Sequence, residues 1–216
     1  MPVSAPEDVR MLWLAALQRV LGRASHDVRD VLNGVTVNLE VIRSRCARPE
    51  LPAAALAPFA DAAGQQLERL TTLLEAVLAL GRAEREPADV AVILRRVATL
   101  CGASASSADA VVLVDVGDVE STATRVHGDA VRLALATPLL ELVSGTDRST
   151  RATPVRCTVS EAEGAIVVTI GAAGRRALMP EAVAEAVRAA GVRRAEGEQG
   201  DTGAEPDDLS LTFPRA

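Results

Sequence analysis

The chain has 216 residues, of which 49% are hydrophobic, and a net charge of −6. It is therefore long enough to bury the core of one large domain or of two small ones. Every basic residue is an arginine and only 1% of the residues are aromatic, a composition that argues against nucleic-acid binding. The three cysteines form no CxxC or Cys/His cluster, and we expect neither a disulfide framework nor a zinc site.

The sequence does not begin with the basic and then apolar segments of a signal peptide. The most apolar stretch near its start, Met11–Leu17, ends at Gln18 and Arg19 and is far shorter than a membrane span. We therefore expect a cytoplasmic protein with reduced cysteines and no contact with a membrane.

The first part of the chain predicts two long helices. Ser4-Ala5-Pro6-Glu7 has capping-box spacing, and no strong breaker follows until Pro49 and Pro52, which predicts one helix of about 40 residues. A second segment with apolar residues at steps of three and four runs to about Gly81. Two long helices joined by a short loop form an antiparallel hairpin, and its uncovered apolar stripes predict that two copies pair as a dimeric four-helix bundle.

The charged tract at 82–89 predicts a boundary between a helical domain at 1–84 and a second domain at 87–216. Beyond it we expect helices at 90–100, 129–143 and 180–190, strands at 111–116, 154–160, 165–170 and 209–213, and a polar loop at 191–208. Helices and strands mixed in this order predict an α/β sandwich. The whole chain is therefore expected to be α+β.

The stretch ASHDVRDVLNG at 24–34 holds one of only two histidines in the chain. At 100° per residue, the apolar residues of the first helix share one arc about 100° wide: Leu17, Leu21, Ala24, Val28, Val31, Leu32, Val35, Leu39 and Ile42. His26 lies about 180° from the centre of this arc, and Asp30, Asn33 and Val37 fall on the same outer face. A solvated surface histidine is the plain explanation.

The residues around His26 also resemble a known motif. SHDVRDVLN at 25–33 resembles the phosphoacceptor box of the dimerisation and histidine-phosphotransfer domain of sensor histidine kinases, usually written H-[DE]-L-[RK]-x-P-L. The resemblance implies that His26 accepts a phosphoryl group and that Asp27 accepts a hydrogen bond from its ring. Arg29 would hold phosphate oxygens or a partner's acidic rim, or is a solvated charge.

Two positions depart from that family's pattern. Val31 stands where the family has a proline, so the usual helix kink should be weaker or absent. Asp30 stands where many kinases that also dephosphorylate their regulator carry Thr or Asn, which argues against phosphatase activity.

The second half resembles the kinase catalytic domain but lacks its nucleotide motifs. RVHGDAVRL at 125–133 is similar to the segment V-x-G-D-x-x-R-L that leads into the ATP-binding helix. The Mg²⁺-ligating Asn of the family would fall near Val143, Gly171-Ala-Ala-Gly174 replaces D-x-G-x-G, and 196–205 lacks the glycine-rich lid. We interpret the domain as degenerate and ATPase-like, with His127 structural and Asp129 an N-cap.

Together these features resemble dimeric histidine phosphotransferases. The resemblance implies that His26 takes a phosphoryl group from a receiver-domain aspartate or a hybrid histidine kinase and passes it to another response-regulator receiver. We expect no metal or cofactor of the protein's own, because the receiver would bring Mg²⁺, and we expect Asp30, Asn33 and Val37 to help dock it. Two alternatives stay open: a pseudokinase scaffold that carries no phosphate, and a true kinase with a divergent nucleotide pocket.

Overall fold

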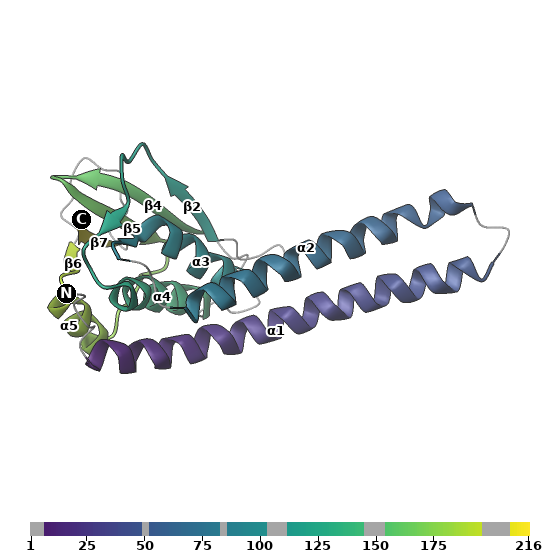
Figure 1. Cartoon of the computed structure of the whole chain (residues 1–216), viewed down its shortest axis with the longest axis horizontal. Coiled ribbons are helices and arrows are strands. Elements are labelled where there is room, and N and C mark those ends of the chain that lie inside the picture. The colour runs from purple at the N-terminus through teal and green to yellow at the C-terminus, as the bar shows by residue number, and fades with distance from the viewer. Residues whose placement is uncertain (1–6, 49–51, 83–85, 103–111, 145–153, 196–207) are drawn as a thin grey trace.

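The computed structural model describes residues 7–48, 52–82, 86–102, 112–144, 154–195 and 208–216. The capping signal at 4–6, the domain boundary at 83–85 and the sequence that lacks the lid motif at 196–205 lie outside these residues. The chain is α+β, as expected: a long helical hairpin is followed by helices packed on a mixed sheet (Figure 1).

The hairpin consists of α1, Glu7–Cys46, and α2, Ala57–Leu80, with the short 3₁₀ turn η1, Ala53–Ala55, before α2. The prediction of one helix of about 40 residues is confirmed, because α1 spans 40 residues. The helices approach closely at Gly34, where a Cβ would collide with the side chain of Gln66 on α2. Among the described residues, no helix combines the length and the apolarity needed to span a bilayer.

In the described part of the C-terminal half, five strands form a sheet in the order β2-β4-β5-β7-β6. These strands are Val112–Val116 (β2), Val155–Ala162 (β4), Ala165–Gly171 (β5), Arg193–Ala195 (β6) and Leu209–Pro214 (β7). β2 pairs parallel with β4, and the other pairs are antiparallel. The strands expected at 154–160 and 165–170 are confirmed, and they pair as the β4–β5 hairpin. Glu163 and Gly164, with φ of 51° and 71°, make its tight turn.

The structure adds three short strands that the sequence pattern missed. β6 lies inside the segment expected to be a loop, because three residues are too few to show alternation. Ala88–Asp89 (β1) and Ala123–Thr124 (β3) pair antiparallel and are shorter still. Each of these strands is identified only by its hydrogen bonds to the strand that it pairs with.

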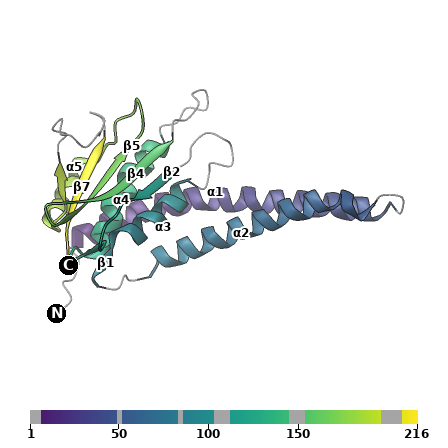
Figure 2. The same cartoon turned by 90° about the horizontal axis from the view of Figure 1, so that it is seen from above.

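The three remaining helices are α3, Val90–Gly102, α4, Gly128–Ser144, and α5, Glu181–Ala189. Figures 1 and 2 show α3 and α4 between the sheet and the hairpin, with the hairpin tip extending well beyond the rest of the molecule. Most residues of α4 are buried, around all of its sides. A helix that is buried on all its sides must be covered on all of them, and here α1, α3 and α5 pack around α4.

Arg132 of α4 links this helix to both helices of the hairpin. Its buried guanidinium pairs with Asp129 through Nη1 at 3.1 Å and donates from Nη2 to the carbonyl oxygen of Arg82 at 2.5 Å. The guanidinium carbon lies 5.8 Å from the ring centroid of Trp13 on α1. The end of α2 and the start of α1 are thereby held against the same helix.

The start of α4 corrects one expectation. α4 begins at Gly128, and the residue that caps it is His127, not Asp129. The His127 backbone carbonyl accepts from Ala130 N–H at 2.9 Å, and its ring Nδ1 accepts from Asp129 N–H at 3.2 Å. Asp129 lies in the first turn, where a carboxylate stabilises the positive helix end. His127 therefore has a structural task, in agreement with the sequence interpretation.

We expect one of the three cysteines to react with Ellman's reagent in the folded protein. Cys46 is exposed at the end of α1, whereas Cys101 and Cys157 are buried, and burial raises the pKa of both buried thiols to about 12. Only a thiolate attacks the reagent. One thiol per chain should therefore react fast at pH 8, and all three after denaturation; fast reaction of two or three native thiols would contradict this packing.

Candidate functional site

The packing of α1 divides the predicted apolar arc into two faces. One face is buried against α2 and the C-terminal half, with members at steps of three and four: Val9, Trp13, Ala16, Val20, Ala24, Asp27, Val31 and Val35. The other edge of the arc, which includes Leu32 and Leu39, is exposed in the single chain. His26 belongs to neither face and lies on the outer side, as expected.

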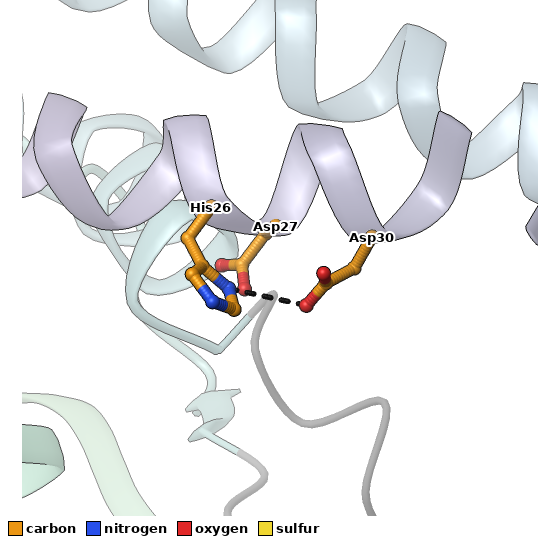
Figure 3. A group of neighbouring side chains, drawn as sticks. All are labelled: His26, Asp27 and Asp30. Atoms are coloured by element: carbon orange, nitrogen blue, oxygen red, sulfur yellow. Dashed lines mark ion pairs between the residues drawn. The ribbon is translucent and has the colours of Figure 1, made fainter. Parts of the chain in front are cut away.

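The ring of His26 is held by an acid one helical turn later. Its side chain is 69% exposed, and Nδ1 lies 3.1 Å from Oδ2 of Asp30 (Figure 3). Residues four apart lie on the same face of a helix, so this pair needs no distortion of α1. A carboxylate beside Nδ1 favours the tautomer with the proton on that nitrogen, which leaves the lone pair on Nε2.

Asp27 differs from both of these residues because it lies in the buried stripe. It is 3% exposed, and its Oδ2 is buried with no hydrogen-bond partner among the described residues. Burial raises the pKa of the Asp27 carboxyl, while Arg23 and Arg69 oppose this rise. Arg69 lies on α2, so the charges around Asp27 come from both helices of the hairpin.

This geometry changes the role expected for Asp27. The sequence resemblance predicts that Asp27 accepts the hydrogen bond from the ring, whereas in the structure the ion pair of His26 is with Asp30. Asp30 was expected to contact a partner only. The spacing of four residues is a signal for this pair that the sequence contains. The proximity of Arg69 to Asp27 has no such signal, because it depends on how the two helices pair.

The other predicted site residues lie near His26 on the outside of the hairpin. Arg29, Asn33 and Val37 are all exposed, and Val37 is a large apolar side chain on a polar surface. Together with His26 and Asp30 they form one exposed strip of α1, which we call the His26 strip. It offers an apolar contact and both signs of charge to a visiting surface.

The residues at the positions of the kinase nucleotide motifs make contacts within the chain. A Cβ at Gly171, where the family motif has its Asp, would collide with the carboxylate of Asp208. Arg175 Nη1 donates to the carbonyl oxygen of Leu142 at 2.6 Å, which ties the turn after β5 to the end of α4. Val143, at the position expected for a metal-ligating Asn, is buried. Val143 therefore offers no oxygen ligand to a metal ion, whereas beside Gly171 the nearest carboxylate is that of Asp208.

Replacing Asp27 by Asn should stabilise the protein at pH 8. Because burial raises its pKa, the folded state holds the proton more tightly than the unfolded chain does. Its contribution to stability is therefore present at acidic pH and is lost as the pH rises through the raised pKa. We expect the free energy of unfolding of Asp27→Asn to exceed that of the native chain by about 1 kcal/mol at pH 8, measured by urea denaturation.

The gain should shrink as the pH is lowered through the raised pKa of Asp27, because the native carboxyl then becomes protonated and neutral like the amide. Asp30→Asn is the matched control, because Asp30 is exposed and should change stability by less than about 0.5 kcal/mol. An Asp27→Asn variant no more stable than the native chain at pH 8 would contradict the electrostatic cost assigned to Asp27.

No family model matches the chain, and no curated protein matches it at a significant level. Solved structures similar to it include the histidine kinase domain of a blue-light activated histidine kinase from Erythrobacter litoralis, at 14% identity and a TM-score of 0.44 over 89% of this chain and 94% of that one. The Acinetobacter baumannii histidine kinase AdeS is similar at 14% identity and a TM-score of 0.42, over 87% and 95% of the two chains.

A structure described as a bacterial phosphotransferase is similar over 98% of each chain, at 11% identity and a TM-score of 0.37. At TM-scores this low, none of these likenesses assigns a function to the chain.

Proposed function

We propose that this protein is a histidine phosphotransferase of a two-component phosphorelay. His26 takes a phosphoryl group from the aspartate of one receiver domain, or from a hybrid histidine kinase, and passes it to the aspartate of another receiver. The single observation that supports this proposal is the exposed ring of His26 with Asp30 beside its Nδ1. The Mg²⁺ ion and the acidic pocket belong to the partner.

The geometry suits both directions of transfer. The Nε2 lone pair attacks phosphorus, the P–O bond to the donor aspartate breaks, and its electron pair leaves with the carboxylate. The ring becomes a cation that keeps its proton on Nδ1, where the negative charge of Asp30 stabilises it. In the second step a carboxylate oxygen of the acceptor attacks phosphorus, the N–P bond breaks and the ring returns to its neutral form. No proton is gained or lost.

The C-terminal half supports a relay more than an autokinase. Asp208 occupies the space beside Gly171, and Arg175 spans from the end of β5 to α4. Gly171 has no carboxylate of its own and Val143 has no amide, so the two side chains that the kinase resemblance requires for adenine and Mg²⁺ are missing. We propose that this half serves to hold α1 and to extend the docking surface, and that the phosphoryl group comes from another protein.

Replacing His26 by Gln should abolish phosphotransfer. We expect a phosphorylated receiver domain from the same organism to label the native protein, and the His26→Gln variant to be labelled at least about 100-fold less. His127→Asn is the matched control, because Asn can also cap α4 and the second histidine should not accept phosphate. Labelled ATP should give no phosphorylation of the native protein.

A native protein that accepts phosphate from none of the organism's receivers, but binds one of them, would instead be a scaffold. Phosphorylation from ATP alone would restore the third alternative, a true kinase.

The proposed relay is a homodimer. Large apolar side chains on both helices of the hairpin are 46–59% exposed: Leu14, Leu32, Leu39, Leu67, Leu74 and Leu78. Leu32 and Leu39 are seven residues apart on α1, Leu14 lies 18 residues, or five turns, before Leu32, and Leu67, Leu74 and Leu78 are seven and four residues apart on α2. Each set therefore lies on one face of its helix, as in a bundle interface. A second copy of the hairpin would cover both stripes and leave the His26 strip, on the other side of α1, accessible to receivers.

A charge in this stripe should dissociate the dimer. We expect light scattering to give twice the 22.5 kDa of one chain for the native protein, and a monomer for the double variant Leu32→Glu with Leu74→Glu, because burying the carboxylates is too costly. Val37→Glu is the control, since Val37 lies about 160° around α1 from Leu39 and should not affect association. A native monomer at tens of micromolar would overturn the dimer.

A further inference from the structure

We propose that His26, Asp27 and Asp30 form a site for a divalent transition-metal ion, and that an ion bound there blocks phosphorylation of His26. The three side chains project from the same side of α1 and converge (Figure 3). One ligand atom from each lies within 4.8 Å of the others. From the sequence we expect no metal of the protein's own, because the receiver would bring Mg²⁺; the convergence of these three side chains is a property of the folded chain.

The distances within the cluster suit one ion. Two ligands on a tetrahedral zinc ion, with bonds of about 2.0–2.1 Å, lie about 3.3 Å apart. Nδ1 of His26 and Oδ2 of Asp30 are 3.1 Å apart. These two atoms can therefore bind one ion with little movement, and Asp27 supplies the third ligand after a small shift.

Asp27 is the observation that separates this cluster from an ordinary surface ion pair. Its Oδ2 is buried without a hydrogen-bond partner in the described part of the chain, and a buried carboxylate oxygen is costly unless something binds it. An ion between His26 and Asp30 would bind that oxygen. The positive charges of Arg23 and Arg69 already offset part of the negative charge of Asp27. We therefore expect the metal ion to bind with a dissociation constant in the micromolar range and to exchange readily.

The donor set selects the class of ion. One imidazole and two carboxylates suit zinc and its neighbours in the transition series, whereas Mg²⁺ and Ca²⁺ prefer oxygen ligands alone. Three protein ligands leave a fourth position of a tetrahedral ion open to water. Zinc should therefore bind here, and millimolar Mg²⁺ should not compete with it.

The effect on reactivity follows from the two nitrogens of one ring, and it rests on the proposed function. When an ion occupies Nδ1, the neutral ring carries its proton on Nε2. One proton leaves Nδ1 and one binds Nε2, so there is no net change. Nε2 then has no free lone pair for an attack on phosphorus. The ion and the phosphoryl group are thus mutually exclusive on His26.

The binding test uses the full-length protein without any receiver. Zinc is titrated in competition with a chromophoric chelator in a Cys46→Ser background, because Cys46 is an exposed thiol that also binds zinc. We expect one ion per chain, and binding weaker by at least about tenfold in each of the variants His26→Gln, Asp27→Asn and Asp30→Asn. Glu40→Gln, an exposed acid elsewhere on α1, should bind as tightly as the parent.

Two readouts separate this site from its proposed consequence. Nitrogen NMR of the His26 ring should show Nδ1 ligated and Nε2 protonated in the zinc-bound protein, and zinc should slow labelling by a phosphorylated receiver in the native chain but not in Asp30→Asn. An Asp27→Asn variant that binds zinc as tightly as its parent, or zinc binding that survives His26→Gln, would overturn the site. If the protein binds zinc but accepts no phosphate from any receiver, the metal site is supported and the proposed relay function is wrong.

Discussion

The buried guanidinium of Arg132 is the contact on which the position of α1 depends. A charge removed from water is stable only if it finds its partners inside the protein. Arg132 finds them on three elements: Asp129 on its own helix, the last carbonyls after α2, and the face of Trp13 on α1. Because most residues of α4 are buried, the helix must be covered on all its sides, and α1 provides one of these covers. The hairpin and the C-terminal half therefore share one core.

The direction of His26 follows from this attachment. Once α1 turns its stripe of small and apolar residues toward α2 and α4, a step of about 100° per residue places His26 outside and Asp27 inside. The acid that contacts the ring is then Asp30, one turn later. Asp27, on the inside, is buried at an electrostatic cost that the charges of Arg23 and Arg69 partly offset.

The C-terminal half makes contacts within the chain at the positions of the kinase nucleotide motifs. The turn after β5, which would meet a ligand in the kinase pattern, is tied by Arg175 to the end of α4. The Asp208 carboxylate lies where a side chain at Gly171 would begin. These contacts stabilise the packing of α4, and α4 in turn holds α1. On the proposed function, the half that lost its own ligand maintains the helix on which another protein acts.

Periodicity was sufficient to predict the elements whose pattern is long. The apolar steps along α1 and α2, the alternation along β4 and β5, and the outward face of His26 all follow from the order of residues, because one repeat extends over many positions. β6 and the β1–β3 pair were not predicted, because strands of two or three residues are too short to show a repeating pattern. The sequence pattern predicts Asp129 as the N-cap of α4, whereas the helix begins at Gly128 and its N-cap is therefore His127.

What the sequence by itself determined is therefore local: that α1 is a helix, that its apolar residues share one broad arc and that His26 lies opposite to it. Only the tertiary structure decided which part of that arc is covered within one chain and which part, with Leu32 and Leu39, stays exposed. It also decided that Asp27 is enclosed near Arg69. The physical reason is that burial and charge depend on what packs across from a residue, and the partner helix lies far away along the chain.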